Sequence, residues 1–170
     1  MDTRVVTYLQ SAWHPSLPVC LQGQDLEKSI ANTVSILRTK KSHEECLTAI
    51  EKALSLYQKS AATGENIETL GGGWVGEEAL AISLFCALQF QDDLRGGVVA
   101  AINHSGDCDS TGAITGNILG AMLGKDVIPV EWIDNLRESA LVEKNAADLF
   151  VPHHENESDL DFDWSARYPE

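Results

Sequence analysis

Residues 79–88 form an almost uninterrupted apolar segment, Ala-Leu-Ala-Ile-Ser-Leu-Phe-Cys-Ala-Leu, shortly after three consecutive glycines at 71–73. A helix of this composition is apolar on nearly every face, so it belongs in the interior of a protein rather than on its surface. The glycine run is too flexible to belong to a regular element and predicts a turn. This part of the chain therefore predicts a turn followed by a buried helix.

The preceding segments have the spacing of amphipathic helices. A first helix is predicted from Asp25. Ser42 and Glu45 have the spacing of a capping box, which predicts the start of a second helix that stops near Gly64. The apolar positions behind these two predictions are Leu26, Ile30, Val34 and Leu37 in the first helix, and Leu47, Ile50, Leu54 and Tyr57 in the second.

Helices are also predicted after the apolar segment. Asp92 or Asp93 is expected to cap one that runs through Ala101, and another is expected from about Thr111 to Leu123. Pro129 suits the first turn of a last helix, which carries Trp132, Ile133, Leu136 and Leu141. Alternation typical of strands is scarce, so the fold class is predicted to be all-α.

Charge is distributed unevenly along the chain. Residues 1–62 carry seven Lys or Arg and six Asp or Glu, whereas residues 63–170 carry five and twenty, within a net charge of −14. An acidic surface repels phosphate groups, which argues against direct binding to nucleic acids or to anionic membranes. An anionic ligand of the acidic part would need a bound cation beside it.

The four cysteines and the apolar runs bear on location. Cys20, Cys46, Cys86 and Cys108 contain no C-x-x-C pair, which argues against a zinc cage and fits reduced thiols. No apolar run approaches the roughly 20 residues that span a bilayer. A cytoplasmic protein is expected.

Residues 103–110 are the most informative for function. Asp107 and Asp109 are two positions apart in a glycine-flanked loop directly before a helix, and Ser110 adds a hydroxyl. Three such oxygens are hard ligands, suited to magnesium, manganese or calcium. Helix capping is the competing interpretation, because Asp and Ser are favoured at a helix start. Capping needs one such residue rather than three, so a metal site is the favoured prediction.

Glycine recurs at every fourth position in the following helix, at Gly112, Gly116, Gly120 and Gly124. Each internal glycine costs roughly 1 kcal/mol relative to alanine, so the pattern predicts a groove that admits another helix or a ligand. Close helix packing is the expectation for most of them. For Gly112, beside the metal loop, space for a ligand is an equal alternative.

The Asp-x-Asp-Ser sequence has a second interpretation, a haloacid-dehalogenase-like phosphatase with Asp107 as nucleophile and a strand at 98–102. That site needs an apolar residue directly before the first aspartate, where Gly106 stands. It also needs alternating strands and helices downstream, which the pattern does not indicate. Half of a metal cluster in a helical hydrolase is the favoured interpretation.

Residues 103–114, Asn-His-Ser-Gly-Asp-Cys-Asp-Ser-Thr-Gly-Ala-Ile, resemble the C-terminal metal motif of the ADP-ribosylglycohydrolases, the dinitrogenase-reductase-activating glycohydrolase-like family. The likeness extends back through residues 70–81 and forward through Gly120-Ala121, Ile128-Pro129 with Trp132, and the ending 164–169. It covers residues 63–170 well, and residues 25–62 only as generic helices.

The resemblance implies a compact all-α, multi-helix bundle that hydrolyses the bond between ADP-ribose and a modified protein or another acceptor. It implies two magnesium ions, or manganese, with Asp107, Asp109 and Ser110 as metal ligands and the two aspartates as catalytic candidates. Such ions would let an acidic surface hold a pyrophosphate, and would position or activate a water. Metal-held carboxylates could accept a proton from that water.

The resemblance also implies substrate contacts. Trp74 matches a position that lines the substrate cleft, although an aromatic that closes a helix start against the core is an equal alternative. Gly112 is the second candidate for substrate binding. Glu77 and Glu78 are interpreted as structural, because the dipole of a helix favours acids in its first turn. His14 and His104 are not included among the catalytic candidates.

The chain also departs from the family pattern. The first ligand trio of the family, a Thr-Asp-Asp motif, is absent, and the one Asp-Asp pair, Asp92-Asp93, follows Gln91. We therefore expect a truncated, C-terminal half of such a domain. Its expected parts are an N-terminal helical segment (1–62), the half with the metal loop (63–150) and an acidic tail (151–170).

This departure leaves two functions open. Activity is expected to be impaired, unless a second copy or a complementing N-terminal half supplies the missing ligands. The alternative is an inactive remnant or binding module of the same fold, without turnover.

Overall fold

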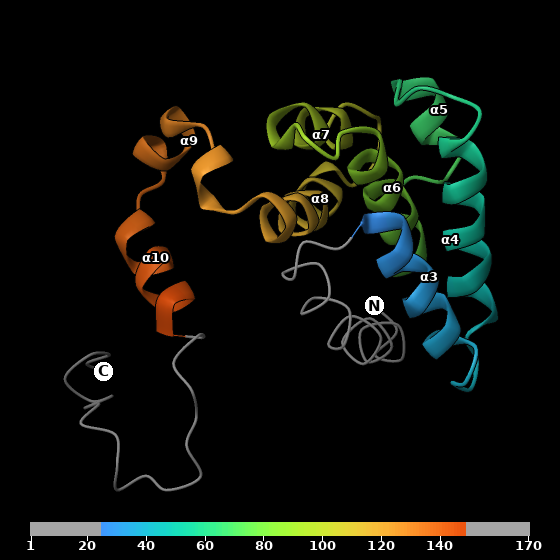
Figure 1. Cartoon of the computed structure of the whole chain (residues 1–170). Helices are drawn as coiled ribbons and strands as arrows, with labels where there is room; N and C mark the ends of the chain where they lie inside the picture. The colour runs from blue at the N-terminus through green and yellow to red at the C-terminus, as the bar shows by residue number, and fades with distance from the viewer. Residues whose placement is uncertain (1–24, 149–170) are drawn as a thin grey trace, which may run out of the picture. The chain divides into compact units, whose positions relative to one another are not determined.

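The computed structural model describes residues 25–148, and within them every regular element is a helix. The first unit ends at Pro129 and holds α3 (Leu26–Leu37), α4 (Glu44–Tyr57), α5 (Gly64–Glu68), α6 (Gly76–Gln89), α7 (Leu94–Ala101), α8 (Cys108–Leu123) and the 3₁₀ helix η1 (Lys125–Val127). The second unit begins at Val130 and holds α9 (Val130–Asn135) and α10 (Ser139–Asp148). The all-α prediction is confirmed (Figure 1).

Helix α6 is the centre of the first unit. All ten residues from Ala79 to Leu88 are buried, and the Phe85 side chain has 0% of its surface exposed. The helix packs against α4, α7 and α8, which cover it from different sides (Figure 1). The buried helix predicted for residues 79–88 is confirmed, because its apolar surface on every face requires this enclosure.

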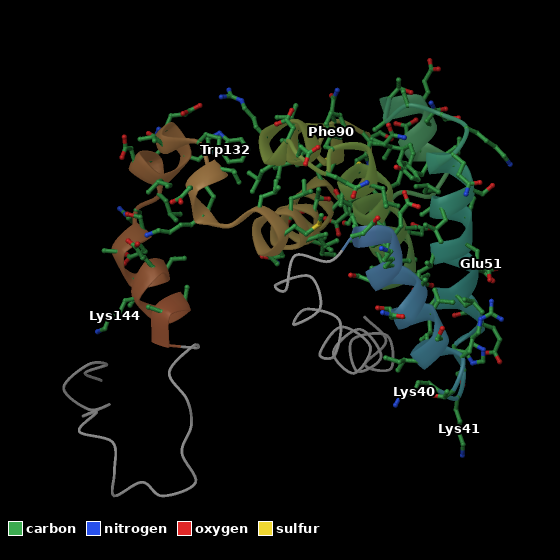
Figure 2. The ribbon with its side chains drawn as sticks, in the orientation of Figure 1. Lys40, Lys41, Glu51, Phe90, Trp132 and Lys144 are labelled. Atoms are coloured by element: carbon green, nitrogen blue, oxygen red, sulfur yellow. The ribbon has the colours of Figure 1, made fainter. Side chains whose placement is uncertain are left out.

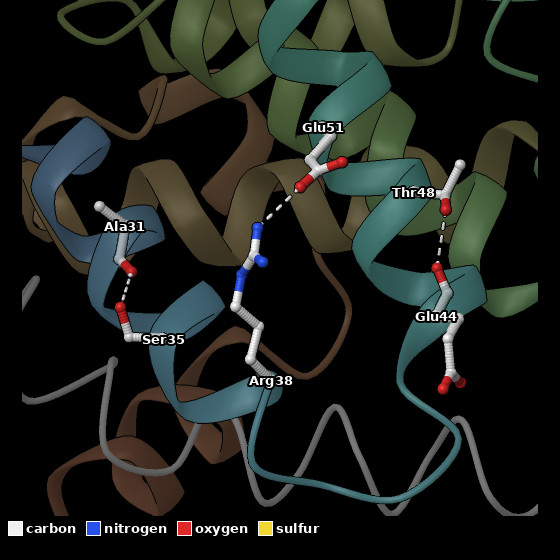
Figure 3. A network of polar contacts seen from close by, with 6 residues as sticks. All are labelled: Ala31, Ser35, Arg38, Glu44, Thr48 and Glu51. Atoms are coloured by element: carbon white, nitrogen blue, oxygen red, sulfur yellow. Dashed lines mark hydrogen bonds and ion pairs between the residues drawn. The ribbon is translucent and has the colours of Figure 1, made fainter.

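Helices α3 and α4 form a hairpin. The Asp25 carboxylate accepts a hydrogen bond from the Glu27 amide at 2.8 Å, which confirms the predicted start of the first helix. The Arg38 guanidinium, at the end of α3, lies 3.0 Å from the Glu51 carboxylate of α4 (Figure 3). Both side chains are more than half exposed, so this pair contributes only about 0–1 kcal/mol. Lys40 and Lys41 extend from the turn between the two helices (Figure 2).

The capping box predicted at Ser42 and Glu45 is wrong. Helix α4 begins at Glu44, its N-cap residue is His43, and no side chain caps it. Ser42 has a φ of 55°, in the left-handed region, whereas an N-cap residue typically has a negative φ. The helix also ends at Tyr57, well before Gly64.

The end of α4 is held by α6. The side-chain amide of Gln89 donates to the Ser60 carbonyl at 2.8 Å and to the Tyr57 carbonyl at 3.3 Å. Terminal carbonyls have no partner inside their own helix, so this side chain satisfies the last carbonyl of α4 and one in the segment that follows it. Gly64 instead begins α5, where the Thr63 hydroxyl accepts from the Asn66 amide at 3.3 Å.

Helices α7 and α8 cover α6 next to the candidate site. The Asp93 carboxylate accepts from the Gly96 amide at 2.9 Å, which confirms Asp93 as the cap of α7. The Ser83 hydroxyl of α6 donates to the Thr111 carbonyl of α8 at 3.1 Å. Residues 98–102, which the phosphatase interpretation needs as a strand, lie in α7 and at its C-terminal end.

The glycine stripe of α8 faces α7 only in its first half. A Cβ atom on Gly112 would lie 2.5 Å from Ile102 Cγ2, and one on Gly116 would lie 3.6 Å from Val98 Cγ2. Close helix packing is therefore confirmed at Gly112, whereas the contact at Gly116 is an ordinary van der Waals contact. At Gly120 and Gly124 no atom of the described residues would lie within 4 Å of an added Cβ, so the expectation of close packing for most of the four glycines is wrong.

The single helix predicted after Pro129 is wrong, because α9 and α10 are separate. The Leu136 amide donates to the Ile133 carbonyl at 3.1 Å and the Ser139 amide to the Leu136 carbonyl at 3.2 Å. Bonds of this i to i+3 type tighten the backbone and end the α-helical register. Trp132 lies on α9 and Lys144 on α10 (Figure 2).

Two further predictions concern the division of the chain at residue 62 and the ends of the chain. The boundary between residues 62 and 63 stays a prediction, although α4 and α6 pack together across it. Several predictions lie outside the described residues: those for His14 and Cys20, and those for the acidic tail at 151–170, which includes the motif ending 164–169. Within residues 25–148, no helix is both long and apolar enough to cross a membrane.

Candidate active site

The three predicted metal ligands come together at the start of α8. Asp107 is the N-cap residue, and Asp109 and Ser110 lie in the first turn, because the helix begins at Cys108 rather than at Thr111. The Asp107 carboxylate accepts a hydrogen bond from the Ser110 amide at 3.5 Å. Asp107 therefore caps the helix through the Ser110 amide, and the side chains of Asp109 and Ser110 do not act as the cap.

The two aspartate carboxyl groups lie side by side. The pKa of Asp107 is lowered, first by an interaction with the Asp109 carboxyl group and then by hydrogen bonds with Ser110. Two neighbouring carboxyl groups at one helix start form a strongly electronegative point.

His104 braces the loop made of residues 103–110. Its Nδ1 accepts from the Gly106 amide at 3.1 Å, so the ring proton belongs on Nε2, which lies 3.1 Å from the Thr111 hydroxyl. That hydroxyl in turn donates to the Ala101 carbonyl at 2.7 Å. Both ring nitrogens thus lie at hydrogen-bond distance from neighbouring groups, one in the loop and one at the start of α8.

The glycine loop, residues 71–73, lies directly against the 103–110 loop. The Asp107 amide donates to the Gly72 carbonyl at 2.8 Å. A Cβ atom on Gly106 would overlap that same carbonyl oxygen, so only glycine fits there. Two loops more than 30 residues apart in the sequence therefore form one surface, and no local pattern predicts this contact.

Two glutamates anchor the paired loops. One Glu78 oxygen accepts from the Gly72 amide at 3.0 Å and from the Gly73 amide at 3.1 Å. The Glu68 carboxylate accepts from the Ser105 amide at 3.2 Å, and hydrogen bonds with Ser105 lower the pKa of Glu68.

The structural role predicted for Glu78 rested on the helix dipole, and its bonds to the glycine loop were missed. The position of Glu78 in the sequence indicates these bonds. Val75 is the N-cap residue of α6, so Glu78 holds the third helical position, from which an acidic side chain reaches back to amides upstream.

Trp74 follows the glycine loop and is 73% exposed. An added Cβ on Gly72 would lie 2.6 Å from the indole Cδ1, so the ring lies over this glycine. The alternative in which Trp74 closes a helix start against the core is wrong. Its contact with substrate stays a prediction. The same holds for Gly112, which is buried and faces Ile102.

The donor atoms match a hard cation in kind but fill only part of its coordination. Two carboxylates and a hydroxyl are oxygen donors of the sort that magnesium prefers. Among residues 25–148, no group of three or more His, Cys, Asp or Glu side chains is placed to hold a metal ion.

Comparisons with known proteins point to one family. The model of the ADP-ribosylglycohydrolase family matches residues 9–159, so it includes the segment before residue 63 that carries no motif of its own. The ADP-ribosylarginine hydrolase Tri1 of Pseudomonas putida (strain GB-1) is 27% identical over 134 residues, which cover 79% of this chain and 32% of that protein.

The ADP-ribosylarginine hydrolase Tri1 of Serratia proteamaculans (strain 568) is 36% identical over 59 residues, which cover 35% of this chain and 16% of that protein. The chain thus spans a third or less of the curated relatives it matches. No solved structure matches significantly. The match over residues 9–159 shows that the chain belongs to the ADP-ribosylglycohydrolase family.

Proposed function

We propose that this chain takes part in magnesium-dependent hydrolysis of ADP-ribose glycosidic bonds, with Asp107, Asp109 and Ser110 as metal ligands. The observation that carries the proposal is the position of Asp107, Asp109 and Ser110 together at the start of α8, with the exposed Trp74 on the adjoining glycine loop. The family membership supplies the chemistry for that site.

The donor set supports a hard divalent cation, because the carboxylates of Asp107 and Asp109 and the hydroxyl of Ser110 are oxygen ligands on one helical turn. When bound, magnesium would polarise an oxygen of the substrate and orient a water for attack at the anomeric carbon. The carboxylates of Asp107 and Asp109 could accept a proton from such a water. The Trp74 indole offers an exposed ring face on which a ligand base can stack.

The substrate proposed first is ADP-ribosylated arginine, since both curated relatives are named ADP-ribosylarginine hydrolases. Magnesium takes six ligands, and three come from α8. We propose that waters and a second chain, either another copy or a complementing polypeptide, supply the others.

Titration with Mn²⁺ and release of ADP-ribose from an ADP-ribosylated arginine substrate in Mg²⁺ test the proposal together. We expect Asp109→Asn to weaken metal binding at least about tenfold and to reduce release by a similar factor. Asp126→Asn is the matched control, because Asp126 lies exposed on η1 and has the same charge. Equal binding and release by wild type and Asp109→Asn would contradict the assignment.

A second candidate function is binding of ADP-ribose without turnover. The small number of metal-binding side chains within residues 25–148 favours it. It predicts that the wild-type chain binds ADP-ribose, as measured by calorimetry or on an affinity column. The chain should release no ADP-ribose from the substrate at any Mg²⁺ concentration. Measurable release would contradict it.

A further inference from the structure

We propose that Glu78 is a positioning residue, which holds the glycine loop and through it both Asp107 and Trp74. The inference rests on the function proposed for Asp107, and it assigns the α6 carboxylate a role in that site. One Glu78 oxygen accepts from two successive amides, those of Gly72 and Gly73. Hydrogen bonds to a charged acceptor are about twice as strong as neutral ones, so this carboxylate fixes the loop firmly.

The backbone of the glycine loop is shaped around this carboxylate. Gly71 has a φ of 126° and Gly73 a φ of 74°, values that other residues rarely adopt. A Cβ atom on Gly71 would overlap the Glu78 carboxyl carbon. The absence of a side chain at Gly71 therefore leaves room for the carboxylate to reach the loop amides.

A single residue, Gly72, transmits the position of Glu78 to the site. Its amide is held by Glu78, while its carbonyl accepts from the Asp107 amide at 2.8 Å. The Trp74 indole lies over the same residue, 2.6 Å from where a Cβ would stand. A shift of Gly72 must therefore move the cap of α8 and the exposed indole together.

The neighbouring glutamate offers a matched control. Glu77 lies in the same first turn of α6 and carries the same charge, so its effects on the helix dipole and on a distant cation resemble those of Glu78. No hydrogen bond links its carboxylate to the glycine loop within the described residues. A difference between Glu78→Gln and Glu77→Gln therefore isolates the bonds to Gly72 and Gly73.

The first measurement is amide hydrogen exchange of the full chain without metal. In Glu78→Gln we expect the Asp107 amide, which Glu78 does not touch, to exchange about tenfold faster, as for the loss of one charge-assisted hydrogen bond. In the same variant, the Ile82 and Leu84 amides of α6 should keep their wild-type exchange rates. In Glu77→Gln, the Asp107, Ile82 and Leu84 amides should all exchange at wild-type rates. An unchanged Asp107 amide, or equal acceleration along α6, would overturn the proposal.

The second measurement is the Mn²⁺ affinity of the same variants. We expect about tenfold weaker binding in Glu78→Gln, because groups that orient metal ligands typically matter by this factor. Glu77→Gln should bind within about twofold of wild type. Equal affinities in both variants would overturn the positioning role. A wild type that binds no Mn²⁺ contradicts the proposed function, while faster exchange at Asp107 would still support the role of Glu78.

Discussion

The contact between the glycine loop and the 103–110 loop depends on individual backbone atoms. The Gly72 carbonyl receives the Asp107 amide, and the position above it is open only because Gly106 has no side chain. His104 accepts from the Gly106 amide of the 103–110 loop, and Glu68 accepts from the Ser105 amide. The geometry of the metal candidates therefore depends on residues that carry no catalytic group.

The substitution Gly106→Ala tests this dependence. The new methyl group would overlap a backbone oxygen that cannot turn away, so the loops must separate. We expect a loss of about 2 kcal/mol or more in the free energy of unfolding. Urea titration of the purified chain measures it, and a stability within about 0.5 kcal/mol of wild type would count against the described contact.

Gly120→Ala is the opposite case on the same chain. Gly120 lies inside α8, and an added Cβ meets no atom of the described residues within 4 Å. Alanine is favoured over glycine in a helix interior, so we expect an increase in stability of up to about 1 kcal/mol. A loss in the same urea titration would show that another part of the chain occupies that space.

The buried thiols lead to a prediction about pH. Burial raises the pKa of Cys86 to about 12, and burial together with the negative charge of Glu77 raises the pKa of Cys46 to about 11. Because the thiolate is the reactive form, neither should react with a thiol reagent at pH 8 until the protein unfolds. The folded state disfavours these thiolates, so stability should fall as the pH rises above 9.0, the ordinary thiol value.

Mass spectrometry of alkylated peptides, with and without urea, checks the thiol prediction. Rapid labelling of Cys86 in the native chain would contradict its burial.

Among the elements, α6 has the widest structural role. It is enclosed by α4, α7 and α8, its Ser83 hydroxyl bonds to α8, and its first turn holds the glycine loop through Glu78. The same helix thus forms the core and supports the site. Damage to its interior should affect both.

Phe85→Ala measures the contribution of α6 to the core. Phe85 is fully buried, and its truncation should cost about 3–5 kcal/mol through lost burial and the cavity left behind. Val99→Ala on α7 is the control, because Val99 is 46% exposed and should lose less than about 1 kcal/mol. Similar losses in thermal or urea unfolding would argue against α6 as the core helix.

At the scale of the whole molecule, charge and metal binding are linked. A chain with a net charge of −14 repels itself, and a cation at the start of α8 would relieve part of that repulsion. A ligand that binds only the folded state raises stability, by about 2.7 kcal/mol at a concentration of 100 times its Kd. The proposed site therefore predicts a Tm that rises with Mg²⁺.

A thermal scan separates specific binding from screening. Mg²⁺ should raise the Tm by several degrees more than NaCl at equal ionic strength, and Asp107→Asn should abolish this excess. An excess that survives in Asp107→Asn would place the responsible cation elsewhere on the acidic surface.

Local sequence patterns determined most of the elements. The apolar run of α6 allowed only a buried helix, and the side chains of Asp25 and Asp93 cap helices at the expected positions. The three metal candidates lie together at the start of α8, although the helix begins three residues before the predicted Thr111. These features depend on residues a few positions apart, which is the range that periodicity and capping rules describe.

The tertiary structure alone decided where those elements meet. Ser42 has the sequence of a cap but a left-handed backbone, and the helix predicted after Pro129 divides in two. The contact of Gly72 with Asp107 joins residues 35 positions apart. Such contacts depend on how α6, α7 and α8 pack. The same local pattern is compatible with many long-range contacts, so the pattern alone does not determine which of them form.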